Sequence, residues 1–413
     1  MQQGDLFNAV LEAYEGATEG VLDNASLYAA VADRTGLAAA DLEARTPVGK
    51  AGTPRSLVKR QVRWIQQTLK SMQVLERVEG ARGVWALANR TRTGLHDAAA
   101  GTRLVAFSTR LGVAVWGRCE DVLAGLDQDI TLVATSPPYP LNRPRRYDNP
   151  PESAYTDFLC RALEPVIARL VPGGSVCLNL GNDVFLPGMP ARSLYRERLA
   201  IALAERFGLY RMDTLIWSNP SRPPGPTQWA SLRRMQLNAS YEAIDWFCND
   251  PLRARADNRR VLEPHTDRQR RLVRAGGEQR SGTYGDGAFR LRPGAFARET
   301  PGRIPRNVIV RGHRCADTDR VRADAGRLGL PAHGAQQPLA IAEFLVRFLA
   351  GEGDLVVDPF GGTAKTGMAA ERHRRRWIVV ERMLDYLRVG AERFRGAAGF
   401  RMPAAVEAWP AGR

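Results

Sequence analysis

One segment near the end of the chain restricts the fold more strongly than any other. Residues 354–381 predict an apolar strand ending at Asp358, a glycine-rich turn, a helix and a second apolar strand ending at Glu381. In doubly wound sheets such a unit holds an adenosine-bearing cofactor, because glycines let the backbone approach the ligand and the last carboxylate can accept both ribose hydroxyls. The spacing around Lys365 does not fit a phosphate-binding P-loop, which argues against a nucleoside triphosphate. Alone, the unit also fits an ordinary tight strand–helix connection.

A second informative segment is Ser136-Pro137-Pro138-Tyr139, which directly follows the apolar run 130–134. The prolines stiffen the backbone and leave carbonyl groups free to accept hydrogen bonds. If Ser136 Oγ and the Pro137 carbonyl accept the hydrogens of a base amine, its nitrogen becomes tetrahedral and its lone pair can attack a methyl sulfonium in line. Tyr139 then offers a stacking face for a base rotated out of a duplex. The alternatives are a polyproline ligand for an SH3- or WW-type domain and a rigid turn, but the buried character of the preceding strand disfavours both.

Most of the remaining chain after the first hundred residues alternates between predicted strands and helices. This alternation is typical of an α/β fold with a doubly wound, mostly parallel sheet. The predicted strands are 104–107, 113–117, 130–134, 175–180, 211–217, 241–247, 354–358 and 377–381, and the predicted helices are 155–170, 192–207 and 366–374.

Residues 1–90 predict a separate small domain, divided from the rest by a polar stretch at 89–102. Helical patterns at 6–14 and 27–32 precede a basic helix at 56–71, and strands at 74–78 and 84–87 flank a turn. Three helices followed by a hairpin resemble a winged-helix domain, a family in which the third helix enters the major groove. That resemblance makes three residues candidate DNA contacts: Lys59, Arg60 and Arg63. The alternative is a domain that dimerises or docks another protein.

The net charge of +15 and the pI of about 10.2 favour a polyanionic partner, with nucleic acid as the first candidate. Residues 251–330 contain 19 Arg, no Lys and nine Asp or Glu, a balance of +10. Little periodicity accompanies this charge, so the middle of the range is either a disordered basic loop or a surface that contacts DNA. Arg259 and Arg260 are the candidate contacts in it.

The five cysteines are scattered and form no CxxC motif, which predicts a reduced cytoplasmic protein without a structural metal. No apolar run approaches the ~18 to 20 residues of a membrane span, and no apolar signal segment begins the chain. We therefore expect no association with a membrane.

Together, these segments resemble the β class of amino-methylating DNA methyltransferases over residues 103–395. In that family the (S/D/N)PP(Y/F) segment precedes the target-recognition region and the DPFxGxG segment comes last, which is the order seen here. The resemblance implies a Rossmann-like core with a catalytic half at 103–250, an arginine-rich target-recognition insertion at 251–330 and a cofactor-binding half at 331–400. It implies S-adenosylmethionine as cofactor, catalytic roles for Ser136, Pro137, Pro138 and Tyr139, and cofactor-binding roles for Thr135, Gln337, Pro338, Asp358, Phe360, Gly361, Gly362 and Glu381.

The same resemblance implies site-specific methylation of double-stranded DNA by a bacterial or phage protein that is cytoplasmic and associated with the nucleoid. Serine at position 136 is typical of the branch that modifies cytosine N4, and adenine N6 is the alternative. Enzymes that methylate a protein glutamine or an RNA base usually place the cofactor loop first, whereas here Asp358 follows Ser136 by 222 residues. A non-catalytic DNA-binding regulator with a degenerate core is the alternative of another class. Whether the protein forms a homodimer and whether a cognate restriction enzyme accompanies it are both left open by the sequence.

The cofactor loop departs from the family pattern at Ala364 and Lys365, where the family commonly has glycine and threonine. Loss of a glycine could tighten the turn. The lysine could lower affinity for a cationic cofactor or point toward a DNA phosphate.

Overall fold

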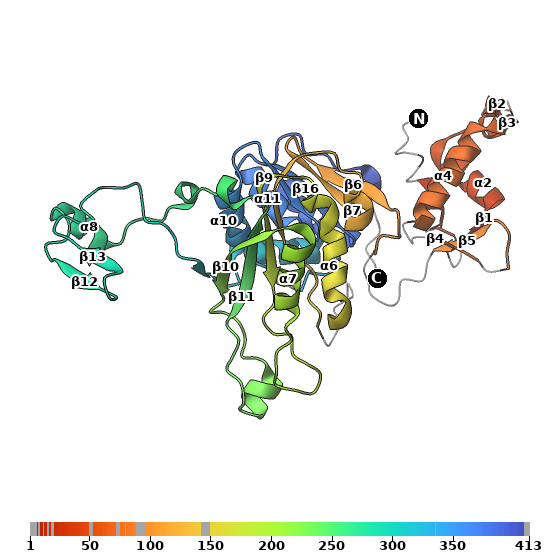
Figure 1. Cartoon of the computed structure of the whole chain (residues 1–413). Helices are drawn as coiled ribbons and strands as arrows, with labels where there is room; N and C mark the ends of the chain where they lie inside the picture. The colour runs from red at the N-terminus through yellow and green to blue at the C-terminus, as the bar shows by residue number, and fades with distance from the viewer. Residues whose placement is uncertain are drawn as a thin grey trace.

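The computed structural model describes residues 96–141, 149–334 and 336–408. Within the first 95 positions it describes residues 6, 9–10, 12–14, 16–17, 20–48, 53–71, 75–78 and 80–87. Parts of several predicted elements lie outside these residues: positions 7, 8 and 11 of the helical pattern at 6–14, Val74 of the strand at 74–78, Glu79 of the turn that follows, and positions 89–95 of the polar stretch. Figure 1 shows a central α/β core from which two segments project, and a separate small N-terminal domain. No helix of the described part is both long and apolar enough to cross a membrane.

The core is built on a sheet of nine described strands in the order β14-β10-β11-β9-β8-β15-β16-β7-β6. Five of its eight neighbouring pairs are parallel, which confirms the predicted mostly parallel sheet. The strands are β6 (Arg103–Ser108), β7 (Gly112–Gly117), β8 (Ile130–Thr135), β9 (Leu170–Leu180), β10 (Tyr210–Ser218), β11 (Tyr241–Cys248), β14 (Val308–Val310), β15 (Leu355–Asp358) and β16 (Arg376–Glu381).

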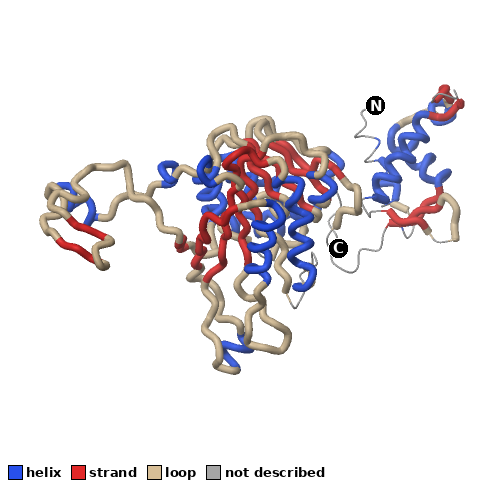
Figure 2. Tube along the Cα trace, in the orientation of Figure 1, coloured by secondary structure: helices blue, strands red, loops and turns tan. Residues whose placement is uncertain are grey.

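Helices cover both faces of this sheet (Figure 2), which explains why its central strands are apolar at consecutive positions. Alternate residues point to opposite faces: Val357 packs into the layer of α6 and α7, and Val356 into the layer of α10, α11 and α12. The covering helices are α5 (Cys119–Leu123), α6 (Glu152–Ile167), α7 (Tyr195–Phe207), α10 (Leu339–Leu349), α11 (Lys365–Arg372) and α12 (Leu384–Ala391).

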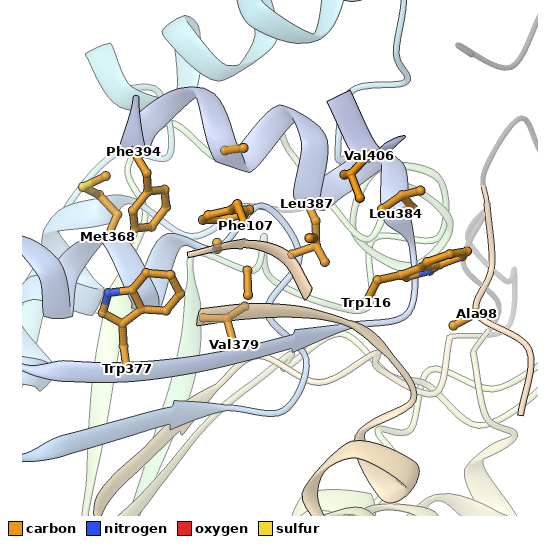
Figure 3. Close-up of a cluster of buried hydrophobic side chains, with 14 of the residues drawn as sticks. Ala98, Phe107, Trp116, Met368, Trp377, Val379, Leu384, Leu387, Phe394 and Val406 are labelled. Carbon is orange, nitrogen blue, oxygen red and sulfur yellow. The ribbon is translucent and has the colours of Figure 1, made fainter. Parts of the chain in front are cut away.

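Large aromatic residues fill one of these layers (Figure 3). The rings of Phe107 and Trp377 each lie with their centroids 5.0 Å from that of Phe394. Phe107, Trp377 and Phe394 are buried and come from β6, β16 and the 3₁₀ turn after α12, so this cluster ties the edge of the sheet to the C-terminal helices.

The boundaries around β9 differ from the prediction. The strand begins at Leu170 instead of 175 and runs through Pro172-Gly173-Gly174, with an irregular register against β8. Gly173 has φ +81°, and a Cβ atom there would lie 1.8 Å from the Arg253 carbonyl oxygen, so only glycine lets the 3₁₀ turn Pro251–Arg253 pack so closely. The helix expected to end at 170 therefore ends at Ile167.

The N-terminal domain contains the predicted basic helix and hairpin. The helix is α4 (Leu57–Ser71), whose buried Val62, Ile65 and Leu69 face the domain core. Strands β4 (Leu75–Arg77) and β5 (Val84–Leu87) pair antiparallel, and β1 (Val21–Asp23) completes a three-stranded sheet. Asp23 caps the following helix by accepting the backbone N–H of Ser26 at 2.8 Å. The other elements are α2 (Asn24–Thr35), α3 (Ala39–Glu43), β2 (Arg45–Val48) and β3 (Thr53–Ser56), of which the last three were not predicted.

Residues 251–330 do not form one separate insertion. Strand β14 joins the edge of the central sheet, and α9 (Ala316–Arg327) packs against α12. Residues 263–303, here called the arm, project from the core on one side (Figure 1), and an antiparallel bridge between Glu263 and Arg303 closes the base of the arm. A second projection lies between β10 and β11 and carries the short helix η2 (Thr227–Leu232). The arm carries regular structure instead of a featureless loop, namely α8 (Asp267–Arg274) and the hairpin of β12 (Gly282–Tyr284) and β13 (Phe289–Leu291).

Candidate active site

A cavity of about 580 Å³ opens at the carboxyl ends of β8, β15 and β16, which are neighbours in the sheet. Because parallel strands end at the same edge, the two segments singled out in the sequence line one cavity although they are far apart in the chain. From the first segment and its surroundings the lining includes Ser136, Pro137, Pro138, Tyr139, Asn179 and Glu242. From the second it includes Asp358, Phe360, Gly361, Gly362 and Glu381.

The hydroxyl of Tyr139 is the centre of a hydrogen-bond network on one wall. It donates to Glu242 Oε2 at 3.0 Å and lies 3.2 Å from Ser136 Oγ. Asn179 Nδ2 donates to the same Glu242 oxygen at 3.1 Å and lies 3.3 Å from the Tyr139 hydroxyl. Since the single Tyr139 proton is directed to the carboxylate, its oxygen accepts from Ser136, and the Ser136 lone pairs stay available to the cavity.

Two contacts fix the position of Tyr139. A Cβ atom at Gly181 would lie 2.6 Å from Tyr139 Cδ2, so glycine makes room for the ring. Asn149 Nδ2 donates to the Tyr139 carbonyl at 2.6 Å. Burial and the nearby Glu242 carboxylate raise the pKa of Tyr139 well above its usual value, so the phenol keeps its proton. The sequence predicted only a stacking face for this residue.

Asp358 is held at the end of β15 and also lines the cavity. Its Oδ1 accepts from Thr135 Oγ1 at 2.6 Å and from the Phe360 backbone N–H at 3.1 Å. Burial raises the pKa of Asp358 to about 6. Thr135 is buried and does not itself line the cavity, but its hydroxyl orients the Asp358 carboxylate, which does; its cofactor-binding role stays a prediction.

Glu381 ends β16 and faces the cavity beside the glycine-rich turn. Its two oxygens accept from the backbone N–H groups of Gly362 at 2.7 Å and Met383 at 2.8 Å. Burial raises the pKa of Glu381 to about 7. A carboxylate so fixed by the backbone has lone pairs left for further hydroxyl donors.

The glycine-rich turn packs tightly against β16. A Cβ atom at Gly361 would lie 2.0 Å from Val379 Cγ1, which excludes any other residue there without rearrangement. Ala364 occupies the left-handed region at φ 55° where the family commonly has glycine. Gln337 lines the cavity, whereas Pro338 is not part of this lining and forms the N-cap of α10.

Lys365 does not point toward a DNA phosphate, contrary to one of the two expectations for it. Its Nζ donates to the Gln337 carbonyl at 2.6 Å and lies 3.4 Å from Asp317 Oδ2, and its side chain is 7% exposed. Burial and the nearby Arg393 lower the pKa of Lys365 to about 8.

The five basic residues predicted to contact DNA differ in their surroundings. Arg60 is exposed on α4, whereas Lys59 pairs with Glu43 and Arg63 donates to the Tyr28 hydroxyl at 2.8 Å. Arg259 and Arg260 both pair with Asp257, at 2.8 Å and 3.8 Å, and only the Arg259 side chain is largely exposed. Among the residues that the structure describes, no cluster of His, Cys, Asp and Glu forms a metal site.

Comparison with known proteins gives the family of the core. A family model described as DNA methylase matches residues 130–392. The chain is 31% identical over 296 residues to the type II methyltransferase M.PvuII of Proteus hauseri. The aligned region covers 70% of this chain and 85% of that relative. The chain belongs to the DNA methylase family.

Further comparisons of this DNA methylase concern a solved structure, a second relative and the N-terminal residues. The solved structure of PvuII DNA methyltransferase, described as cytosine-N4-specific, matches with 28% identity and a TM-score of 0.55, over 70% of this chain and 87% of that one. The type II methyltransferase M2.DpnII of Streptococcus pneumoniae is 33% identical over 76 residues, covering 18% of this chain and 26% of the relative. A second family model, described as Mrr N-terminal domain, matches residues 5–97.

Proposed function

We propose that this DNA methylase transfers a methyl group from S-adenosylmethionine to the exocyclic N4 of a cytosine rotated out of double-stranded DNA. The observation that carries the proposal is the hydrogen-bond direction at Ser136, whose lone pairs face a cavity that also holds the Asp358 and Glu381 carboxylates. The similarity to the cytosine-N4-specific PvuII methyltransferase supports the choice of base.

The residues of the cavity fit S-adenosylmethionine, which supplies an electrophilic methyl group when bound. Glu381 has carboxylate lone pairs for the ribose hydroxyls, and Asp358 places a second negative charge at the strand ends, suited to a cationic cofactor. Gln337 lines the same cavity, and its side-chain Oε1 is buried without a hydrogen-bond partner in the described part of the chain.

Positioning is the main catalytic contribution of the protein. Ser136 Oγ and the Pro137 carbonyl accept the two hydrogens of the target amine, which draws its lone pair out of conjugation with the ring. Asn179 Oδ1 is buried, has no partner among the described residues and belongs to the same cavity, so it offers another acceptor. The path from Ser136 through Tyr139 to Glu242 gives the proton released by the amine a route to a carboxylate.

DNA is held by surfaces outside the cavity. Arg60 on α4 of the N-terminal domain and the exposed basic side chains of the arm, such as Arg280, are suited to phosphate contacts. The arm also exposes Tyr284, Phe289 and Phe296, which can stack on bases or pack into a groove. A homodimer and a cognate restriction enzyme stay predictions from the resemblance.

The test is to incubate the purified protein with S-adenosylmethionine and mixed-sequence DNA and to identify the modified nucleosides by mass spectrometry. N4-methylcytosine is the expected product. N6-methyladenine is the second candidate, because a serine oxygen can accept hydrogens from either amine. This product would support the mechanism but contradict the assignment of cytosine as the target base. Cofactor binding without any modified base would contradict the proposal and favour a non-catalytic DNA-binding regulator.

A further inference from the structure

Arg222 stands at the far end of the hydrogen-bond network that begins at Ser136. The Ser136 hydroxyl lies 3.2 Å from that of Tyr139, which donates to Glu242 Oε2 at 3.0 Å. Arg222 Nη1 lies 3.9 Å from the other oxygen of Glu242. In the sheet, Glu242 lies opposite Trp217 of β10, and Arg222 belongs to the loop that leaves the end of this strand. All five residues line the cavity, so this wall runs from an acceptor at Ser136 to a cationic donor at Arg222.

The positive charge of Arg222 is already compensated. Its Nη2 donates to Asp183 Oδ2, and its Nη1 lies near Glu242. Asp183 also pairs with Arg192 at 3.1 Å. Among the described residues, two carboxylates therefore face two guanidinium groups in this cluster. A phosphate is bound most favourably by cations whose charge is not yet neutralised. Arg222 is therefore better suited to a neutral polar ligand than to a phosphate.

Arg222 also has hydrogen-bond donors to spare. A guanidinium group carries five N–H hydrogens. In the described part of the chain, one of them is directed to Asp183 and one to the Tyr241 carbonyl at 3.4 Å, which leaves three. The Arg222 side chain is 24% exposed and lines the cavity. The remaining donors can therefore serve a ligand that enters the cavity.

The part of this wall around Ser136 offers acceptors instead. Ser136 Oγ, the Pro137 carbonyl and Asn179 Oδ1 suit the hydrogens of the target amine. The Watson–Crick edge of cytosine continues from this amine to two acceptors, N3 and O2. The corresponding edge of adenine continues to one acceptor, N1, and then to a C–H group. Because a guanidinium group donates two parallel N–H bonds, it matches both acceptors of cytosine but only one position of adenine.

We infer that Arg222 is a specificity-determining residue, which donates hydrogen bonds to N3 and O2 of the target cytosine while Ser136 and Pro137 hold its amine. This inference rests on the proposed transfer to cytosine N4. It gives a reason for the choice of base that serine alone does not provide, since a serine oxygen accepts from either amine. Asp183 and Glu242 are then positioning residues, because their carboxylates hold the guanidinium group at this wall.

The experiment measures kcat/KM on two duplexes that differ only at the target base, in a sequence that the wild-type protein is found to methylate. One duplex contains cytosine. The other contains an aniline nucleoside, which keeps the amine on a six-membered ring and has C–H groups in place of N3 and O2. Arg222→Met should lower kcat/KM for cytosine about tenfold or more and for the aniline by less than about threefold, because the lost hydrogen bonds exist with cytosine only. The different intrinsic reactivity of the two amines cancels, since each substrate is compared between the two proteins.

The matched control is Arg192→Met. Arg192 pairs with the same Asp183 but is not part of the cavity lining, so this variant should methylate both duplexes as wild type does. Arg222→Lys guards against misfolding of the first variant, because it keeps a positive charge beside Asp183 and loses only the parallel pair of N–H donors. It should also slow methylation of cytosine selectively.

Two kinds of failure are distinguishable. Equal losses on both duplexes, or no loss on either, in both Arg222 variants would overturn the reading of the base by Arg222 and leave the proposed function intact. A wild-type protein that methylates no cytosine in mixed-sequence DNA would overturn the proposed function itself.

Discussion

Thr135 Oγ1 donates to Asp358 Oδ1 across 2.6 Å, and this bond joins the ends of the neighbouring strands β8 and β15. Both residues are buried, Thr135 one position before Ser136 and Asp358 on the cofactor wall. The hydrogen bond therefore couples the position of the catalytic segment to that of the cofactor-binding carboxylate.

The Thr135→Val variant should bind S-adenosylmethionine about tenfold more weakly at pH 7, since a hydrogen bond to a buried charged group contributes about 1.5–3 kcal/mol. The threonine hydroxyl lowers the pKa of Asp358, so its loss raises that pKa further above about 6 and leaves less of the carboxylate ionised. Calorimetry at several pH values measures the effect, with Thr135→Ser as the control that keeps the hydroxyl. Wild-type affinity in Thr135→Val would show that the bond has no part in binding.

The Tyr139→Phe variant separates the aromatic face of this residue from its hydroxyl. The face is retained, so affinity for DNA should hardly change, but Ser136 loses the acceptor that directs its proton away from the cavity. We expect kcat to fall about 100-fold, which is the lower end of the range for removing one preorganised polar group. Steady-state kinetics with a fixed DNA substrate measures kcat and KM separately. A phenylalanine variant as fast as wild type would leave stacking as the whole role of Tyr139.

Glu381 should make the stability of the cofactor-free protein depend on pH. Burial raises its pKa from 4.5 to about 7 in the folded state. Between these values the folded protein binds more protons than the unfolded chain, so stability should fall as pH rises through this window, and Asp358 acts in the same direction up to about pH 6. Thermal unfolding from pH 5 to 8 should show a smaller decrease in Tm for Glu381→Gln than for wild type. Parallel curves for the two proteins would rule out this titration.

Arg60 provides the test of the N-terminal domain as a DNA-binding surface. If its exposed guanidinium neutralises a phosphate, Arg60→Ala should reduce the slope of log K against log salt by about 1. The control is Arg374→Ala, because Arg374 is 79% exposed and precedes β16, at the edge of the sheet opposite the cavity. Binding of duplex DNA measured at several salt concentrations gives both slopes. An unchanged slope for Arg60→Ala would favour a domain that docks a protein.

Those parts of the fold that depend on local pattern could be predicted from the sequence. The apolar runs that end at Asp358 and Glu381 predicted buried strands, and residues at the ends of parallel strands had to meet at one edge. The order of the two motifs was enough to indicate the family, which the comparisons show.

What escaped prediction depends on long-range contacts. The bond from Tyr139 to Glu242 joins residues 103 positions apart, and it exists because β11 runs antiparallel to β9 and brings Glu242 beside Asn179. The burial of Lys365 likewise depends on Asp317 in α9, a helix that the charge pattern had assigned to a separate insertion. A polar, arginine-rich composition hides short helices and strands, because it shows no apolar periodicity.

The most direct test of the account is the single-turnover rate of methyl transfer to DNA by wild type and by Ser136→Ala at saturating cofactor and DNA. Among the hydrogen bonds of the described residues, the Ser136 side chain makes one, to the Tyr139 hydroxyl. The variant should therefore fold normally and bind its cofactor and DNA normally. We predict a rate at least about 100-fold lower, with unchanged affinities for S-adenosylmethionine and DNA, because only the acceptor of the target amine is removed. An equal rate in the two proteins would contradict the central claim that Ser136 activates the base.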